Sequence, residues 1–471
     1  MGRLKRFFGP QDMTQGNIWN SLIVFSVPLL IGNFAQQMYN TVDSIVVSNY
    51  AAHGDNALAA VGVCNPVINL LLVLFMGIST GAGIMVSQFF GAKQKKMLSN
   101  TVGNCLLLTF FSSILMMVVG VLGAPYIMSM LNTPAAIYDG AVQYLQITFL
   151  GILGVAFYNI ISGILRGMGD SLYPLLFLLV ACVLNIILDI VFVKEFHMDV
   201  AGVAWATIIA QAVSAVLCVL RLMRMKDTVE INRSTLRWNR DLVMQITKLG
   251  LPAGLTQAIF SVAMLTVQSL TNTLGEAVVT MTTVVMRVDG FAMMPNFTFG
   301  MAATTFAGQN IGARRLDRVE QGTNAALKLA LGVATLLTLC LLFFGEGLMR
   351  MFTSTEMIVS MGVRSMRIIA VGYICFAASQ VLSGVMRGAG ETMSPMWISI
   401  VTTFVLRLPI AYLWAHFSRS PQWPNGSPDC LYVSLLISWT LGAVLTFLVF
   451  KKGSWRKKML LTMQDSADVS A

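Results

Sequence analysis

The chain has 471 residues, of which 56% are hydrophobic and only 11% are charged. About a quarter of the residues of a globular protein are charged, so this composition excludes an ordinary soluble protein and indicates an integral membrane protein. The formal net charge of +10 could suggest a nucleic-acid partner, but the positions of the charges along the chain give a different explanation.

Apolar stretches long enough to span a membrane recur along the whole chain. A helix of about 20 residues crosses a hydrocarbon core of roughly 30 Å. We therefore predict an all-α integral membrane protein with twelve transmembrane helices. The expected spans are residues 17–49, 57–88, 98–124, 137–165, 171–194, 200–222, 241–272, 278–307, 319–345, 357–386, 392–416 and 430–450.

The charges indicate how these spans are oriented. Residues 1–13 are basic but too short and interrupted for a cleaved signal peptide, so we expect the first span to be retained. Most Lys and Arg lie at the termini or after even-numbered spans, whereas the loops after odd-numbered spans hold only Lys194, Arg350 and Arg419. Positive residues concentrate on the cytoplasmic side of a membrane. We therefore expect a multi-pass protein of the cell (cytoplasmic) membrane with both termini cytoplasmic.

Two halves of the chain repeat one another. The segment "NIISGILRGMGDSLYP" at 159–174 and the segment "QVLSGVMRGAGETMSP" at 380–395 are identical at six of sixteen positions, at an offset of 221. The same offset pairs "SQFFGAK" at 87–93 with "GQNIGAR" at 308–314. Because each repeat contains six spans, an even number, both halves must have the same orientation, as in the parallel repeats of several secondary transporters.

The duplication predicts two lobes of six transmembrane helices related by a parallel internal repeat. We expect an N-terminal lobe at 1–224, a basic cytoplasmic linker at 225–240 and a C-terminal lobe with a basic tail at 241–471. A cleft between two such lobes could open to either side in turn. In the repeated turn, the glycines permit a tight reversal and the proline begins the next helix.

Prolines also occur inside the predicted spans. Pro28 and Pro252 occupy corresponding places in the first and seventh spans. Because proline removes a helical hydrogen bond, both are hinge candidates, and a static kink is the alternative. The seven cysteines lie singly, without a CxxC or Cys/His cluster, and we interpret them as packing residues.

Few acidic residues lie well inside the predicted spans, and these are Asp43, Asp189 and Asp289. An ionisable residue inside a membrane marks a functional site by default. Asp43, Asp189 and Thr207 each lie about six residues, or roughly 9 Å, from the outer end of their helix. Asn185 precedes Asp189 by four residues and therefore shares its helix face.

Two carboxylates, an amide and a hydroxyl at one level form an oxygen-rich pocket. Such a pocket suits a hard monovalent cation, and two nearby carboxylates can also share a proton because both do not stay ionised cheaply. The alternative is that each Asp only caps or hydrogen-bonds a kinked neighbour. The residues predict a cation-coupling site, with Na+ as the metal that could bind, at Asp43, Asn185, Asp189 and Thr207.

The second half has its own charged pair in the segment "VVMRVDGF". Arg287 and Asp289 are two residues apart and do not face each other on a helix, so each needs another partner. Arg287 could line the cleft or fix its helix by bonding to carbonyls, and Arg407 has the same alternatives. We name Arg287 and Asp289 as candidates for a substrate cavity.

With these features assembled, the chain resembles the multidrug and toxic compound extrusion (MATE) transporters along essentially its whole length. The resemblance rests on Pro28 followed fifteen residues later by Asp43, on "AGQNIGA" at 307–313, on the paired turns and on "LNIILD" at 184–189. It implies export of amphipathic, often cationic, organic compounds, driven by an H+ or Na+ gradient and without a cofactor. Small organic substrates and the lipid bilayer are then the expected partners.

The resemblance also implies roles for particular residues. In members with a cation site in the N-terminal lobe, the ligands match the four residues named above, and Gln36 and Tyr39 match positions that line the cavity of that lobe. Another branch has an essential acidic residue soon after the proline of the seventh span. Here that stretch offers only Thr256, Gln257 and Ser261. We therefore expect coupling in the first lobe, and Asp289 is the remaining candidate in the second.

Two rival functions can be compared with the sequence. A flippase for lipid-linked saccharides would need several Arg or Lys inside the cleft, whereas mainly Arg287 and Arg407 lie well inside spans. A membrane-embedded enzyme is not indicated, because three His lie near outer loops and no HExxH, GxSxG or GxxxxGK[ST] motif occurs. We predict a secondary transporter that binds no nucleic acid and functions as a monomer, since twelve helices suffice.

Overall fold

The computed structural model describes residues 10–50 and 54–456, with the side chains of 10–38 and 59–456. This part of the chain is all helical and contains no strand, which confirms the predicted fold class. Eleven of its helices are each long and apolar enough to cross a membrane, and one bent helix pair supplies a twelfth span. The predicted spans and the observed helices agree to within a few residues at most of their ends.

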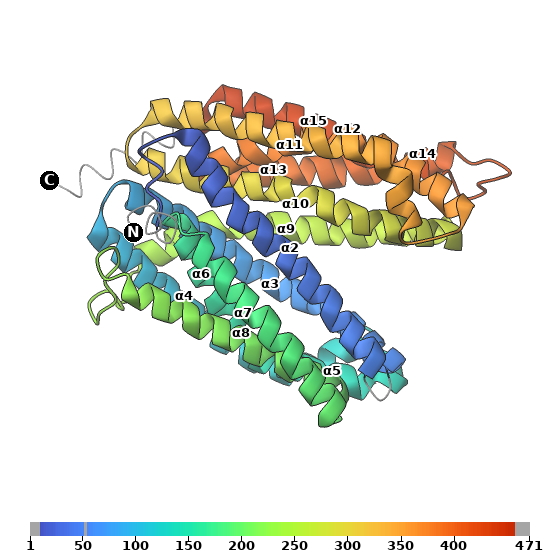
Figure 1. Cartoon of the computed structure of the whole chain (residues 1–471), viewed down its shortest axis with the longest axis horizontal. Coiled ribbons are helices and arrows are strands. Elements are labelled where there is room, and N and C mark those ends of the chain that lie inside the picture. Colours follow the sequence, from blue (N-terminus) through green and yellow to red (C-terminus); the bar gives the residue numbers. More distant parts are fainter. Residues whose placement is uncertain (1–9, 51–53, 457–471) are drawn as a thin grey trace. The chain divides into compact units, whose positions relative to one another are not determined.

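The helices of the first half (Figure 1) are α2 (Ile18–Tyr50), α3 (Gly54–Gly91), α4 (Lys95–Met130), α5 (Ala135–Leu150), α6 (Ile152–Gly167), α7 (Leu172–Asp189), the π-helix η1 (Ile190–Glu195) and α8 (Asp199–Arg224). Those of the second half are α9 (Arg240–Thr273), α10 (Glu276–Gly312), α11 (Leu316–Arg350), α12 (Glu356–Gly388), α13 (Met393–Ile400), the π-helix η2 (Val401–Arg407), α14 (Leu408–Phe417) and α15 (Asp429–Lys452).

Three predicted helices are interrupted, since one bends and two, at 171–194 and 392–416, widen into the π-helices η1 and η2. The expected continuous span at 137–165 bends by 49° between α5 and α6. The bend lies at Gly151, where an added Cβ would be 2.2 Å from the side chain of Ile208 on α8, so only glycine allows this close approach. The eleventh span widens into η2, where the Ser438 hydroxyl of α15 donates to the carbonyl of Thr402 at 2.8 Å.

The chain packs into two compact units whose limits differ from the lobe boundaries drawn from the duplication. Unit 1 contains Met1–Asp12 and Val27–Gly254, and unit 2 contains Met13–Ser26 and Leu255–Ala471. Helix α2 therefore begins in unit 2 and continues in unit 1, and α9 does the reverse. The predicted boundaries at 224/225 and 240/241 follow the repeat, whereas the units follow side-chain and backbone packing.

Backbone contact explains why α9 begins in unit 1. A Cβ added at Gly81 of α3 would lie 2.3 Å from the carbonyl oxygen of Ile246, and one added at Gly77 would lie 2.8 Å from that of Gly250. Small residues let two helices approach this closely, and such contacts hold membrane helices together. The first four turns of α9 are therefore fixed to α3.

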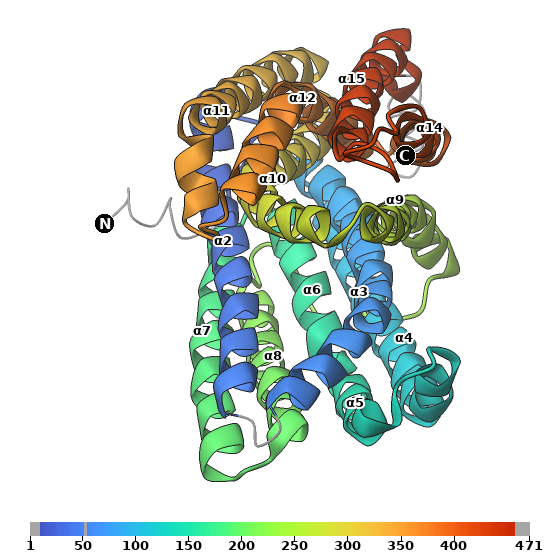
Figure 2. The same ribbon diagram turned by 90° about the vertical axis from the view of Figure 1, so that its right-hand side faces the viewer.

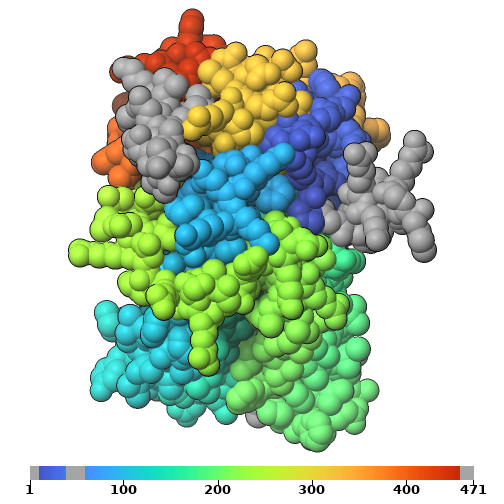
Figure 3. Space-filling model, turned by 90° about the vertical axis from the view of Figure 1, so that its left-hand side faces the viewer, coloured from blue at the N-terminus to red at the C-terminus, as the bar shows by residue number. Residues whose placement is uncertain are grey.

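The segment before α9 is also fastened to unit 1. The Asn104 side chain of α4 donates to the carbonyl of Arg237 at 3.2 Å and accepts from the amide of Asn239 at 2.8 Å. Lys95 forms an ion pair with Glu230 at 2.7 Å. Figure 3 shows this end of the unit, with the green segment after α8 beside the light-blue start of α4.

The segment before α2 is fastened to unit 2 in the same way. The amide of Met13 donates to Gln309 Oε1 at 2.9 Å, and Arg318 Nη2 donates to the carbonyl of Met13 at 3.1 Å. Arg315 Nη1 donates to the carbonyl of Thr14 at 2.7 Å. These partners lie in or just after the motif "GQNIGAR", so the motif anchors the chain where its first membrane helix begins.

The duplication is visible in the backbone. Lys93 and Arg314, which are 221 residues apart, both have φ of +58°, and Gly169 and Gly390 have φ of +83° and +81°. The last two lie in the repeated turn, where a left-handed backbone favours glycine. Both halves therefore reverse direction by the same local structure.

The acidic residue of each turn accepts a hydrogen bond from the first turn of the following helix. Asp170 Oδ1 accepts the amide of Tyr173 at 3.2 Å, and Glu391 Oε1 accepts the amide of Ser394 at 3.1 Å. Asp170 also forms an ion pair with Arg221 at 3.0 Å. Burial raises the pKa of the Asp170 carboxyl, while the hydrogen bonds from Tyr173 and Arg221 oppose that rise.

Candidate functional site

The predicted cation-coupling residues on α7 and α8 lie together in unit 1, where these two helices pack side by side (Figure 2). Asn185 and Asp189 are both fully buried, with no exposed surface. The side-chain nitrogen of Asn185 lies 3.4 Å from the hydroxyl oxygen of Thr207, which is half-buried on α8. The structure thus brings an amide, a hydroxyl and, one turn further along α7, a carboxylate to one place.

Local backbone structure positions Asp189. It is the last residue of α7, and the chain then widens into the π-helix η1. Single π-helical turns within α-helices are frequent at functional sites, because the extra residue redirects the side chains that follow. The apolar sequence "IVFVKE" gave no sign of this change.

The chemistry of the group follows from burial and atom type. A buried carboxylate is costly unless it meets hydrogen-bond donors or a cation. The Asn185 nitrogen is directed at Thr207, so its carbonyl oxygen is the atom that suits a cation. Carboxylate, amide and hydroxyl oxygens together can hold a hard monovalent cation, and the carboxylate alone can hold a proton.

The predicted ligands and cavity residues on α2 are described less fully. The side chains of Asp43 and Tyr39 lie outside the described residues, while Gln36 is half-buried. Helix α2 packs on α7 at Gly32, where an added Cβ would be 3.6 Å from Leu175 and 3.9 Å from Leu178. The helix that carries Asp43 therefore contacts, at Gly32, the helix that carries Asp189.

A second polar group lies in unit 2. The hydroxyl of Tyr373 on α12 donates to Asp289 Oδ1 on α10 at 2.5 Å. Arg407, at the end of η2, lies close enough for its charge to attract the Asp289 carboxylate. Arg287 points elsewhere, since it is exposed and lies 6.0 Å from the ring centre of Phe352. Asp289 and Arg287, both predicted for a substrate cavity, therefore have different surroundings.

Sequence reasoning missed two members of this region. Tyr373 is 1% exposed and its ring lies 5.5 Å from that of Trp439. Asn296 on α10 is also 1% exposed, and neither of its amide atoms has a hydrogen-bond partner among the described residues. A polar amide directly after Pro295, inside an apolar span, was the available signal for Asn296. No such signal distinguished Tyr373 from the other aromatic residues.

The hinge candidates lie where the compact units divide their shared helices. Pro28 is inside α2, next to the boundary between Ser26 and Val27, and Pro252 is inside α9, just before the boundary after Gly254. In the described part of the chain, no three His, Cys, Asp or Glu side chains come together as a metal-ion cluster.

Comparison with known proteins gives consistent matches. The MatE family model matches residues 28–191 and 252–413, so its two copies begin at Pro28 and Pro252. The probable multidrug resistance protein YpnP of Bacillus subtilis is 30% identical over 96% of this chain and 99% of its own length. The probable multidrug resistance protein NorM of Thermotoga maritima is 24% identical over 95% of each chain.

Solved structures support the fold. Crystal structures of a MATE transporter in a straight and in a bent conformation both match with a TM-score of 0.87, covering 95% of this chain and 98% of theirs, at 24% and 23% identity. These relatives are transporters and not enzymes, and they do not favour the lipid-linked saccharide flippase. The repeat, the helical fold and the matches over both halves together show that this chain belongs to the MATE family of multidrug efflux transporters.

Proposed function

We propose that the protein is an antiporter of the cytoplasmic membrane, with cytoplasmic termini, that exports amphipathic, often cationic, organic compounds in exchange for H+ or Na+. Coupling takes place in the first lobe at Asp43, Asn185, Asp189 and Thr207. The observation that carries this proposal is the fully buried Asp189 beside Asn185, whose amide meets Thr207. A buried carboxylate in a membrane span, among oxygen-bearing side chains, is an apt site for a coupling ion.

The helix contacts support Asp43 as a further ligand. Gly32 of α2 packs against Leu175 and Leu178 of α7, and both helices run in the same direction across the membrane in the predicted topology. Asp43 is eleven residues beyond Gly32, and Asp189 is fourteen residues beyond Leu175 and eleven beyond Leu178. Because every helical residue advances by about 1.5 Å, we expect the two acidic residues to lie within about 5 Å of each other in depth.

Cation binding and substrate binding are coupled through α2. This helix starts in unit 2 and continues in unit 1, with Pro28 beside the division. A cation held between α2 and α7 would alter how the second part of α2 packs within unit 1. Export follows if cation and substrate occupy the first lobe in alternation, because each then drives out the other.

The membrane potential alone can drive concentrative export of a neutral substrate, whereas one-for-one exchange with a monovalent cationic substrate moves no net charge and depends on the concentration gradient of the coupling ion. One cation that moves inward at a membrane potential of about 150 mV supplies roughly 3.5 kcal/mol, from about 2.3 kcal/mol per charge per 100 mV. That free energy sustains a gradient of a few hundredfold for a neutral substrate.

The test is uptake of ethidium into everted vesicles under separately imposed H+ and Na+ gradients. Wild type should accumulate the dye with one of the two ions, and Asp189→Asn should not. The matched control is Asp139→Asn, which removes an exposed carboxylate at the start of α5 in the same unit and should leave uptake unchanged.

Gradient-driven uptake that survives in Asp189→Asn would show that this carboxylate is structural and would overturn the coupling site. A wild-type protein that transports no member of a panel of cationic dyes under either gradient would overturn the proposed substrate class. Equal loss of uptake in the control variant would show that the assay measures expression or folding, so protein levels in the vesicles are measured in parallel.

A further inference from the structure

A groove lies in unit 2, between the end of α11 and the first turns of α12, and we call it the α11–α12 groove. Its volume is about 650 Å³. Its lining is amphipathic, with two carboxylates, two guanidinium groups, one hydroxyl and three aliphatic side chains. These are Glu346, Glu356, Val359, Ser360, Val363, Arg364, Arg367 and Ile368. The proposed coupling site uses none of them.

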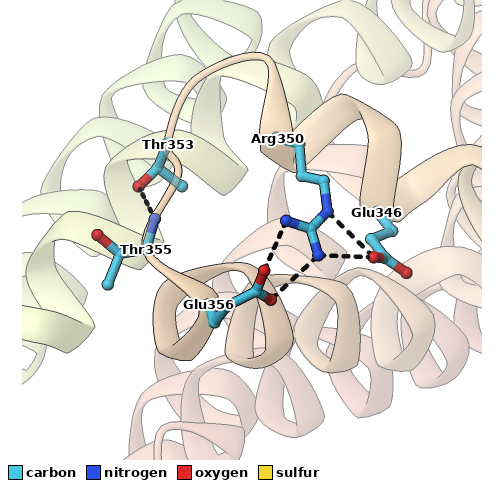
Figure 4. A network of polar contacts seen from close by, with 5 residues as sticks. All are labelled: Glu346, Arg350, Thr353, Thr355 and Glu356. Atoms are coloured by element: carbon cyan, nitrogen blue, oxygen red, sulfur yellow. Dashed lines mark hydrogen bonds and ion pairs between the residues drawn. The ribbon is translucent and has the colours of Figure 1, made fainter.

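The two lining carboxylates, which we call the negative end of the groove, are drawn in Figure 4. Arg350 lies between them, with Nη2 at 3.0 Å from Glu346 Oε1 and Nη1 at 2.7 Å from Glu356 Oε1. The side chains of the two glutamates are 63% and 73% exposed. One guanidinium between two carboxylates leaves one negative charge at this end, which is accessible to a ligand cation.

The turn that joins the two helices holds this end in place. The amide of Thr355 donates to the Thr353 hydroxyl at 3.3 Å, directly before α12 begins at Glu356 (Figure 4). Arg350 and Glu356 are therefore fixed on either side of a short connection. Arg350 thus joins the two carboxylates across the turn.

The guanidinium groups lie deeper along α12. Arg364 forms an ion pair with Asp429, whereas the ion pairs among the described residues do not include Arg367. Arg367 is exposed although it belongs to a candidate membrane span. A cation in such a position needs an anionic partner, because an unpaired charge inside a bilayer is costly.

The depth of each charge follows from helix length. Helix α12 has 33 residues, or about 50 Å at 1.5 Å per residue, and therefore extends roughly 10 Å beyond each side of a hydrocarbon core of about 30 Å. Glu356 then lies outside the core. Arg364 and Arg367 start roughly 12 and 16 Å further in, and long Arg side chains reach back toward the interface. Their guanidinium groups thus come to the level of lipid phosphates.

We propose that the α11–α12 groove binds the headgroup of a zwitterionic phospholipid that carries a primary ammonium, such as phosphatidylethanolamine. The phosphate binds Arg367, assisted by Arg364. The ammonium lies further out, against the exposed faces of the Glu346 and Glu356 carboxylates that Arg350 does not cover, and the aliphatic side chains contact the glycerol and the first acyl carbons. This proposal uses the membrane orientation stated under the proposed function, in which this end of the lobe faces outward.

Charge order distinguishes this ligand from other lipids. In the groove, negative charge lies outermost and positive charge lies deeper, which is complementary to an ammonium outside a phosphate. An anionic headgroup without an ammonium, such as phosphatidylglycerol, would gain only the Arg contacts. A choline headgroup could not donate hydrogen bonds to the carboxylates. The site therefore prefers ethanolamine over both headgroups.

The test is native mass spectrometry of the purified full-length protein in detergent with added phosphatidylethanolamine, phosphatidylcholine or phosphatidylglycerol. Wild type should bind phosphatidylethanolamine most tightly, and Arg367→Gln should weaken that binding by about tenfold, as expected for the loss of a charge-assisted contact. The matched control is Arg419→Gln, which removes another exposed guanidinium from the predicted outer side of unit 2 and should change nothing.

Two further variants make the result decisive. Glu346→Gln together with Glu356→Gln should remove the preference for phosphatidylethanolamine over phosphatidylglycerol, and Val363→Trp should fill the groove and block binding without removing a charge. Equal wild-type affinity for all three lipids, or equal loss in the Arg419→Gln control, would overturn the proposal. Lipid binding is measured without transport, so its failure is distinguishable from failure of the antiporter proposal.

Discussion

The two lobes repeat one helical plan but place their buried polar groups differently. At the offset of 221, Asp289 and Tyr373 of the second lobe correspond to Ile68 and Ile152 of the first. The first lobe has its own polar group on α7 and α8, where the amide of Asn185 meets Thr207 beside the buried Asp189. Duplication therefore preserved helix packing while the polar side chains diverged.

The difference indicates that the buried carboxylates of the two lobes have different roles. Asp289 accepts a hydrogen bond from Tyr373 and lies near the permanent charge of Arg407. A carboxylate in that setting has less attraction left for an exchangeable cation. Asp189 lies one helical turn beyond Asn185, in the first-lobe group that we propose as the coupling site. We infer that the second lobe holds a fixed polar contact at Asp289 and does not exchange the coupling ion.

The largest expected effect is a difference in dye uptake between variants of the two buried carboxylates, Asp189 and Asp289. Asp189→Asn should reduce gradient-driven ethidium uptake by about a hundredfold, to background, because the ion site loses its buried charge. Asp289→Asn should keep at least about half of wild-type uptake, because an amide oxygen still accepts the Tyr373 hydroxyl. Initial uptake rates in everted vesicles measure both. Equal loss of uptake in the two variants would contradict the inference that only the first lobe exchanges the coupling ion.

A smaller effect concerns the fixed contact of the second lobe. Arg407→Met should lower the free energy of unfolding by about 3 kcal/mol, because the buried Asp289 carboxylate loses the attraction of a nearby positive charge. Arg287→Met, at an exposed position, should cost less than about 1 kcal/mol. Thermal unfolding in detergent measures the difference, and equal shifts would show that Arg407 does not stabilise Asp289.

The glycines at equivalent helix contacts give the next prediction. A Cβ at Gly384 would be 2.3 Å from the backbone oxygen of Gly300, whereas one at Gly163 would be 2.2 Å from the Ser79 hydroxyl and 2.8 Å from the Ser79 carbonyl oxygen. We expect Gly384→Ala and Gly163→Ala each to cost about 2 kcal/mol through overpacking.

A second substitution sharpens this prediction. Ser79→Ala should relieve part of the cost of Gly163→Ala, because the nearest clashing atom belongs to a side chain. Gly384→Ala offers no comparable relief, since its nearest clashing atom is backbone. Thermal unfolding of the three variants and of the Ser79→Ala/Gly163→Ala double variant provides the measurement. An unrelieved double variant would mean that the Ser79 carbonyl oxygen dominates in the first lobe as well.

The smallest expected effect concerns the shared helices. Pro28→Ala and Pro252→Ala should each slow dye uptake by about threefold, because a restored backbone hydrogen bond stiffens the helix where the units divide it. Pro66→Ala is the matched control, since Pro66 lies inside α3 and within a single unit. Unchanged rates in both hinge variants would identify static kinks.

Much of this molecule could be predicted because local chemistry determined it. Spans of apolar residues must form helices in a bilayer, where backbone groups find no water, and the predicted spans match the observed helices. The repeated turn could be recognised because glycines at 169 and 390 satisfy the same left-handed backbone. Asn185 and Asp189 could be placed on one face because helical spacing alone puts residues i and i+4 together.

Other features depended on contacts between distant segments. The sequence did not reveal the bend at Gly151, which arises because Ile208 approaches the backbone there. It did not show that Tyr373 bonds to Asp289, because many aromatic residues occupy similar apolar surroundings. The sequence also did not predict that α2 begins in unit 2 or that α9 begins in unit 1. For α9, the reason is the close backbone approach that Gly77 and Gly81 of α3 allow.

The sequence by itself determined the membrane class, the helices, their duplication and the oxygen-bearing residues of the first-lobe site, because periodicity, hydropathy and charge act locally along a chain. Only the tertiary structure decided which side chains meet across helices, where helices bend or widen, and which segments pack as one unit. The physical reason is that these outcomes depend on complementary shapes of surfaces far apart in sequence, down to the presence or absence of a single Cβ atom.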